Sequence, residues 1–252
     1  MTTTTIPIVT KTFHANGIPI EMVHIEAGSY QMGYGQYDDP IPITFKEDYH
    51  IAQYPVTNEL WKAVMGEANE HSAFTGSKHP VERVSWDDIC EKEGFLDTLN
   101  ALPAIAERNA ASGKRFRLPT ESQWEYAARG GKYWQQYPYR YAGSNHLKEV
   151  GWYDKNSHNS TQPVGIKMPN VLGLYDMSGN VWEWCEDIWN DDRSKIPMDG
   201  TACKLEDERY KNRRLVRGGS WDYIDDFCRV AFRYWSFHYN RYISLGCRFS
   251  WY

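Results

Sequence analysis

Between Arg217-Gly-Gly-Ser-Trp221 and Leu245-Gly-Cys-Arg248 the sequence reads Asp222-Tyr-Ile-Asp-Asp-Phe-Cys-Arg-Val-Ala-Phe-Arg-Tyr-Trp-Ser-Phe-His-Tyr-Asn-Arg-Tyr-Ile-Ser244. From Trp221 to Ser244, nine of 24 residues are aromatic, whereas aromatic residues make up 15% of the whole chain. Tyrosine and tryptophan supply large, rigid contact areas, and serine and asparagine supply adaptable hydrogen bonds. Because successive side chains of a strand point to opposite faces, one strand face cannot bury all the aromatic residues between 234 and 242. The stretch therefore predicts an exposed binding surface.

The composition is that of a globular protein and argues against two classes of function. Hydrophobic residues make up 41% and charged residues 24% of the 252 residues. A net charge of −5 argues against a general nucleic-acid-binding protein. No run of 18 apolar residues predicts a membrane span, and residues 1–8 lack the basic and apolar parts of a signal peptide. The 11 Trp and 18 Tyr indicate a rigid, loop-rich fold or a surface that binds carbohydrate or protein.

Helix signals are found only in the first half of the chain. Thr57 or Asn58 can cap a first helix. Ser85 can cap a second, which we expect to continue to about Leu102, where Pro103 interrupts it. A further helical piece and a turn are expected over residues 103–114.

A capping box at Thr120 and Gln123 opens another helix, which is expected to end at Gly130-Gly131. Short strands are expected at residues 20–32 (strand, turn, strand), Val181–Cys185, Leu215–Gly218, Arg229–Arg233 and Gly246–Ser250. No repeat of 20–50 residues is present. The pattern predicts an α+β fold with few helices, short strands and many loops, in one domain.

Several motifs follow one another in an order that resembles the formylglycine-generating-enzyme (sulfatase-modifying factor) family. They are Gly28-Ser-Tyr-Gln-Met-Gly33, Pro55-Val-Thr-Asn58, Pro80-Val-Glu-Arg-Val-Ser-Trp86, Arg117–Gly131, Pro163-Val-Gly165, Gly173–Trp184, Val216–Trp221 and Gly246-Cys-Arg248. The resemblance covers most of residues 25–249. It implies a C-type lectin-like fold of the formylglycine-generating-enzyme type with short antiparallel strands, and a single lectin-like domain over residues 1–252.

Within this fold, the C-terminus resembles the variable proteins of diversity-generating retroelements. Their pattern is Arg-Gly-Gly-Ser-Trp, a variable run, Cys-Arg-x-Ala-x-Arg, a second variable run and Leu-Gly-Phe-Arg. Here Cys228-Arg-Val-Ala-Phe-Arg233 separates residues 222–227 from residues 234–244, and Cys247 stands where Phe is usual. Most residue types in the two runs are reachable by changing the adenines of an asparagine codon, whereas Trp235 would need a different template codon.

The resemblance implies a non-enzymatic, receptor-like protein with a scaffold over residues 20–217 and a variable ligand-binding segment over residues 218–252. Trp182 and Trp184 are assigned to the core, and Arg229 and Arg233 are expected to tie the loops to the scaffold. The predicted ligand-binding residues are Asp222, Tyr223, Ile224, Asp225, Asp226, Tyr234, Trp235, Ser236, Phe237, His238, Tyr239, Asn240, Arg241, Tyr242, Ile243 and Ser244.

Two other functions remain open as alternatives. In the resembled oxidases two cysteines bind copper, and the second matches Cys228 here, but Tyr223 occupies the first position. One thiolate and a phenol make a poor Cu(I) site, so oxidase activity is not expected and no catalytic residue is assigned. The second alternative is a carbohydrate-binding module whose aromatic residues stack on sugars.

No cofactor is expected beyond a structural calcium ion. The resemblance places such an ion at the side chains of Asp176 and Glu183 and the backbone of Gly179 and Val181, and a solvated acidic face is the alternative reading. The five cysteines do not decide between reduced thiols and disulfides. The expected partner is an unknown protein or glycan, not nucleic acid. The resemblance implies the cell surface, with any export signal absent from or replaced in this chain.

Overall fold

A five-stranded antiparallel sheet joins the two ends of the chain. The computed structural model describes residues 6–33, 39–67, 69–204 and 207–252. The strands lie in the order β1-β2-β5-β11-β6. Their bounds are Thr10–Ala15 (β1), Ile18–Ile25 (β2), Tyr49–Ala52 (β5), Ser250–Trp251 (β11) and Phe116–Arg117 (β6). Because β11 pairs with both β5 and β6, the last residues of the chain lie inside this sheet.

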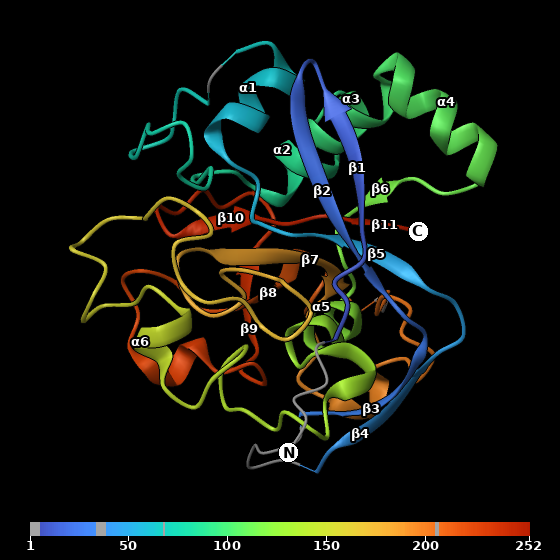
Figure 1. Cartoon of the computed structure of the whole chain (residues 1–252), viewed down its shortest axis with the longest axis vertical. Helices are drawn as coiled ribbons and strands as arrows, with labels where there is room; N and C mark the ends of the chain where they lie inside the picture. The colour runs from blue at the N-terminus through green and yellow to red at the C-terminus, as the bar shows by residue number, and fades with distance from the viewer. Residues whose placement is uncertain (1–5, 34–38, 68, 205–206) are drawn as a thin grey trace.

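A second sheet of four strands carries the C-terminal segment. Its order is β10-β7-β8-β9, with bounds Leu245–Cys247 (β10), Trp182–Ile188 (β7), Arg213–Arg217 (β8) and Tyr234–Phe237 (β9). The pairs β7–β8 and β8–β9 are antiparallel, whereas β10 runs parallel to β7. A hairpin of β3 (Gly28–Met32) and β4 (Ile41–Phe45) completes the strands. Figure 1 shows β7 and β8 at the centre of the molecule.

The helices are few and short, which together with the strands confirms the predicted α+β class. They are α1 (Asn58–Met65), α2 (Trp86–Cys90), α3 (Phe95–Ala101), α4 (Pro103–Ser112), α5 (Glu121–Ala128) and α6 (Leu147–Val150). Short 3-10 helices are η1 (Gly131–Tyr133), η2 (Arg193–Lys195) and η3 (Asp225–Cys228). Helices α1 to α4 gather at one end of the molecule, and α5 lies beside β7 and β8 (Figure 1).

Local capping explains where the helices begin. Thr57, rather than Asn58, caps α1 and accepts a hydrogen bond from Leu60 N. Capping boxes open α2 at Ser85 and α5 at Thr120. Pro103 stands in the first turn of α4, where its missing N–H costs nothing.

Several sequence expectations are wrong. The strand expected at Gly246–Ser250 is divided between β10, which ends at Cys247, and β11, which begins at Ser250 in the other sheet, and α6 lies in the second half of the chain, where no helix was expected. The single helix from residue 86 to about 102 is two helices, because α2 ends at Cys90 and the chain turns through Glu93, which has a φ of 65°, before α3 begins. The strand expected at Arg229–Arg233 is absent: η3 ends at Cys228, a turn covers Val230 and Ala231, and the strand follows at Tyr234. The alternation of Val230 and Phe232 reflects inward packing of a turn, which periodicity alone does not distinguish from a strand.

Candidate functional site

A pocket of about 230 Å³ lies where the C-terminal segment crosses the four-stranded sheet. Its lining includes one residue from each strand: Leu245 from β10, Trp182 from β7, Val216 from β8 and Tyr234 from β9. Leu245 is opposite Trp182, and Val216 is opposite both Trp184 and Tyr234, so the four side chains share one face of the sheet.

The walls of the pocket come from the predicted binding segment. Eight of the predicted residues line it: Tyr223, Tyr234, Trp235, Ser236, Phe237, Asn240, Tyr242 and Ser244. Asn240 Nδ2 donates to Ser236 Oγ and to Tyr242 Oη, both at 3.0 Å, and these bonds hold the loop after β9 against the strand. The segment thus forms a concave surface with rings for apolar contact and hydroxyl groups for hydrogen bonding.

Tyrosines of this segment are among the most exposed large side chains of the described chain. Tyr239 is 53% exposed, Tyr242 55% and Tyr234 43%. Tyr239 stacks on Phe237 with ring centroids 5.5 Å apart, and the ring centroids of Tyr234 and Trp182 are 5.8 Å apart. The exposed rings are therefore supported from below by other rings, which limits the entropy that a ligand contact would cost.

Other predicted site residues have partners within the protein. His238 Nδ1 lies 2.7 Å from both carboxylate oxygens of Asp87. Arg241 makes two hydrogen bonds, of 2.6 and 2.7 Å, to Asp88. The structure therefore uses these two side chains to hold the loop after β9 on α2.

The first variable run lies apart from the pocket except for Tyr223. Asp226 pairs with Arg140 and Arg229, each at 2.8 Å, and Ile224 is 49% exposed. The remaining predicted residues, Asp222, Asp225, Tyr239 and Ile243, do not line the pocket. Ile243 O accepts a hydrogen bond from Trp221 Nε1 at 3.2 Å.

Three arginines, each paired with a buried glutamate, hold the C-terminal segment to the scaffold. Arg217, which ends β8, binds Glu125 of α5 and lies 3.5 Å from Glu121. Arg233 makes two hydrogen bonds to Glu121, of 2.5 and 2.8 Å. Arg248 binds both carboxylate oxygens of Glu183, each at 2.9 Å. All these glutamates are at most 1% exposed. Helix α5 and strand β7 thus supply buried carboxylates that pair with the arginines, and we call these pairs the buried frame.

The floor of the pocket was not predicted from the sequence. Trp182 was assigned to the core, and it is indeed only 3% exposed, but its ring also lines the pocket together with Val216 and Leu245. Val216 and Leu245 lie next to the variable runs, and Trp182 lies in the Gly173–Trp184 motif, so a signal existed. What the sequence lacked was the crossover that brings β10 beside β7.

Tyr223 and Cys228 match the copper positions of the resembled oxidases. In this structure both side chains pack against neighbouring residues. The Tyr223 ring lies edge-on to Trp182 and to Phe227. Cys228 is fully buried, and this burial raises the pKa of its thiol well above the usual range. Cys90, Cys185 and Cys247 are likewise free thiols.

The residues expected to bind calcium already have protein partners. Glu183 pairs with Arg248 and also accepts a hydrogen bond from Trp124 Nε1 at 2.6 Å. Asp176 accepts from Gly165 N at 2.8 Å and from Asn180 Nδ2 at 3.3 Å, and burial raises its pKa to about 6. No group of three or more His, Cys, Asp and Glu side chains within the described ranges is arranged to hold a metal. This arrangement does not fit a calcium ion at Glu183, and the calcium site stays a prediction.

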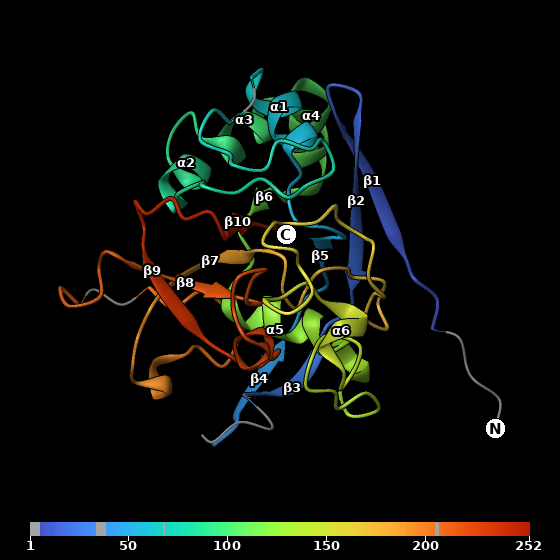
Figure 2. The same ribbon diagram turned by 90° about the vertical axis from the view of Figure 1, so that its left-hand side faces the viewer.

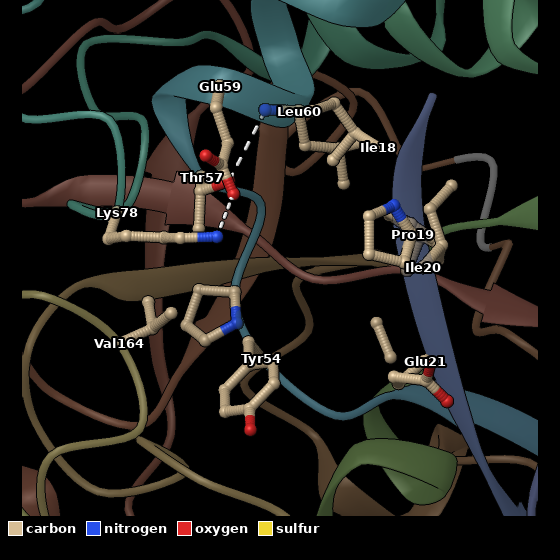
Figure 3. A pocket seen from close by; sticks show the side chains of 13 residues that line it. Ile18, Pro19, Ile20, Glu21, Tyr54, Thr57, Glu59, Leu60, Lys78 and Val164 are labelled. Atoms are coloured by element: carbon tan, nitrogen blue, oxygen red, sulfur yellow. Dashed lines mark hydrogen bonds and ion pairs between the residues drawn. The ribbon is translucent and has the colours of Figure 1, made fainter. Parts of the chain in front are cut away.

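A second pocket, of about 270 Å³, lies between β2 and the start of α1, away from the variable runs. Figure 3 shows the Lys78 ammonium turned toward the Glu59 carboxylate, with Ile18 and Ile20 on the opposite wall. Tyr54, which stacks on Tyr175 with centroids 5.1 Å apart, forms another wall. None of the predicted binding residues lines this pocket.

No helix within the described ranges is long and apolar enough to cross a membrane. Two curated relatives have similar sequences. Chaperone protein LppX of Paenibacillus barcinonensis is 33% identical in an alignment of 203 residues, and the match covers 66% of this chain and 70% of that protein. The formylglycine-generating enzyme of Thermomonospora curvata is 32% identical over 194 residues, 71% of this chain and 56% of that enzyme. The chain therefore spans little more than half of the length of this second relative.

Among solved structures, the Treponema denticola variable protein 1 superimposes with a TM-score of 0.77 at 31% identity, covering 96% of this chain and 98% of that one. This similarity confirms the predicted resemblance to variable proteins. The model of the sulfatase-modifying factor enzyme 1-like domain matches residues 10–251. The protein belongs to the family of sulfatase-modifying factor enzyme 1-like domains.

Proposed function

We propose that this protein is a non-enzymatic, receptor-like binding protein that displays a diversified ligand-binding site, residues 218–252, on a rigid lectin-like scaffold. The observation that carries the proposal is the position of the three arginines that pair with buried glutamates. Arg217 precedes the first variable run, Arg233 separates the two runs, and Arg248 follows the second. Side chains between these fixed points can change without loss of the three arginine contacts.

The exposed aromatic residues support recognition rather than catalysis. Tyrosine and tryptophan are enriched at binding hot spots, where a ligand buries them. Replacing Tyr234 or Tyr242 by Ala should therefore abolish ligand binding while the melting temperature changes little. A large loss of stability would instead place these side chains in the core and contradict the proposal.

An oxidase is the less favoured function. Copper(I) prefers thiolate ligands, and a buried Cys228 whose pKa is raised stays protonated beside a tyrosine at position 223. Incubation with Cu(I) and a peptide of the form Cys-x-Pro-x-Arg should give no formylglycine. Turnover of that peptide would overturn the non-enzymatic assignment.

Diversification can be tested in the DNA that surrounds the coding region. We expect a near-identical repeat that differs from the codons for residues 222–244 mainly at adenines, beside a gene for a reverse transcriptase. A neighbouring sulfatase gene without such a repeat would argue against the proposal. We further propose display at the cell surface, which labelling of intact cells with an antibody against the chain would test.

A further inference from the structure

Strand β9 is an outer strand of the four-stranded sheet, and it belongs to the second variable run. The opposite outer strand, β10, is covered. Cys247 O accepts a hydrogen bond from Val56 N at 2.8 Å, and a Cβ added to Gly246 would lie 2.5 Å from Val81 O. Figure 2 shows β9 descending from near α2 on the outer side of β8. The sheet can therefore be extended at β9 but not at β10.

The register identifies which backbone groups of β9 face outward. Tyr234 is opposite Val216 and Ser236 is opposite Arg214, and His238 N donates to Asn212 O at 2.9 Å in the same register. In an antiparallel ladder the hydrogen-bonded residues alternate, so residues 234, 236 and 238 bond toward β8. The backbone groups of Trp235 and Phe237 consequently point away from the sheet.

Three of these outward groups have no partner among the residues that the structure describes. Phe237 O accepts a hydrogen bond from Asn240 N at 2.9 Å, whereas no bond is made by Trp235 N–H, Trp235 C=O or Phe237 N–H. Natural edge strands are usually guarded by charged residues or proline. The outer strand β1 of the five-stranded sheet contains Lys11, but the four residues of β9, Tyr-Trp-Ser-Phe, contain neither guard.

The pocket runs along this open edge. All four residues of β9 line it, although their side chains alternate between the two faces of the sheet. Tyr234 and Ser236 lie on the pocket face, and Trp235 and Phe237 also line the cavity although their side chains point to the other face, so the cavity borders the backbone of β9. Its volume of about 230 Å³ is below the range of about 300–1,000 Å³ typical for whole small-molecule ligands.

We propose that the ligand is a protein that presents an extended segment, which adds to β9 as a fifth strand and places one side chain in the pocket. This inference rests on the proposed function, which it makes specific. Backbone bonds to Trp235 and Phe237 do not depend on which side chains occupy the variable positions. A diversified receptor thereby keeps a constant source of affinity, while its side chains supply specificity.

The test uses the full chain and a phage-displayed library of random linear 12-residue peptides. We expect the amides of Trp235 and Phe237 to exchange fast in the free protein and more slowly when a selected peptide is bound. Exchange at Ser236 should not change, because its amide already bonds to β8. Peptides that lose binding in Tyr242→Ala but leave the two amides unprotected would overturn the strand addition and leave the proposed function intact.

A matched pair of variants isolates one backbone group. Trp235→Ala removes the side chain and keeps the N–H, whereas Trp235→Pro removes both at an edge position that tolerates proline. We expect Trp235→Pro to bind the selected peptide about tenfold more weakly than Trp235→Ala, the effect of one hydrogen bond. Equal affinities of two folded variants would contradict the inference. If the proline variant fails to fold, the exchange measurement decides.

Two outcomes separate this inference from the proposed function. Binding on a glycan array that is lost in Tyr242→Ala, with no peptide selected, would overturn the protein ligand and keep the binding surface. Selected peptides whose affinity is unchanged in both Tyr234→Ala and Tyr242→Ala, and which leave the amides of β9 unprotected, would overturn both proposals.

Discussion

The two faces of the four-stranded sheet differ in what they bury: one buries charged side chains, and the other exposes aromatic side chains. On the face toward α5, charged side chains are buried: Arg217 and Glu125 are both 0% exposed. On the face toward the pocket, and in the loop that follows β9, large aromatic residues are exposed, among them Tyr239 and Tyr242. Globular proteins ordinarily bury aromatic residues and expose charged ones.

The difference separates the residues that hold the fold from the residues that are available to a ligand. A buried charge pair tolerates substitution poorly, because removing one partner leaves the other desolvated and unpaired. Exposed rings have no such requirement. The protein therefore fixes both ends of each variable run through arginines that lie outside the runs, whereas within the second run His238 and Arg241 also hold the loop on α2.

The largest expected effect is the loss of a buried partner. Arg217→Ala leaves Glu125 without its partner on β8 and should lower the free energy of unfolding by about 3–5 kcal/mol, measured by urea denaturation. The double variant Arg217→Met, Glu125→Leu should recover part of this loss because no unpaired charge remains. If Arg217→Ala had no effect on stability, the buried frame would not hold the segment.

The next effect depends on pH. Asp187 accepts hydrogen bonds from Glu121 N and Cys203 N, and burial, with Glu121 nearby, raises its pKa to about 7. A raised pKa means that the folded protein binds more protons than the unfolded chain, so this group's stabilising contribution falls as pH rises from about 4 to 7. We expect the stability of the wild type relative to Asp187→Asn to decline across that window and to level off above it. A constant difference in unfolding free energy between pH 4 and 8 would show that Asp187 is not perturbed.

A smaller effect compares two arginines of the same loop. Arg233 binds the buried Glu121, and Arg233→Ala should cost about 1.5–3 kcal/mol. Arg229 pairs with Asp226, whose side chain is 46% exposed, and Arg229→Ala should cost less than about 1 kcal/mol. Equal losses in thermal or urea unfolding would mean that burial of the partner does not distinguish the two arginines.

The smallest effect on stability is expected at the exposed rings. Tyr239→Ala should change the free energy of unfolding by no more than about 0.5 kcal/mol. The fully buried Tyr126 of α5 is the matched control, because its replacement by Ala should cost about 3–5 kcal/mol. A loss in Tyr239→Ala comparable to that in Tyr126→Ala would remove the distinction between the two faces.

The sequence predicted the local structure where short-range chemistry decides it. The capping residues Ser85 and Thr120 marked the starts of α2 and α5, and the motifs from Gly28 to Arg248 predicted the family. The break between α2 and α3 and the position of β9 were predicted wrongly. Both depend on how the chain packs against distant residues, which hydrophobic periodicity does not report.

The family, the capped helices and the aromatic residues between Trp221 and Ser244 can all be recognised without the structure. The tertiary fold sets which of those residues meet around one pocket, because the meeting requires β10 to return beside β7. It also decided that His238 and Arg241 bind α2, and that Arg217, Arg233 and Arg248 bind buried glutamates. These charge partners are separated by 65 to 153 positions in the chain. The fold brings them together, so no local sequence pattern predicts the pairs.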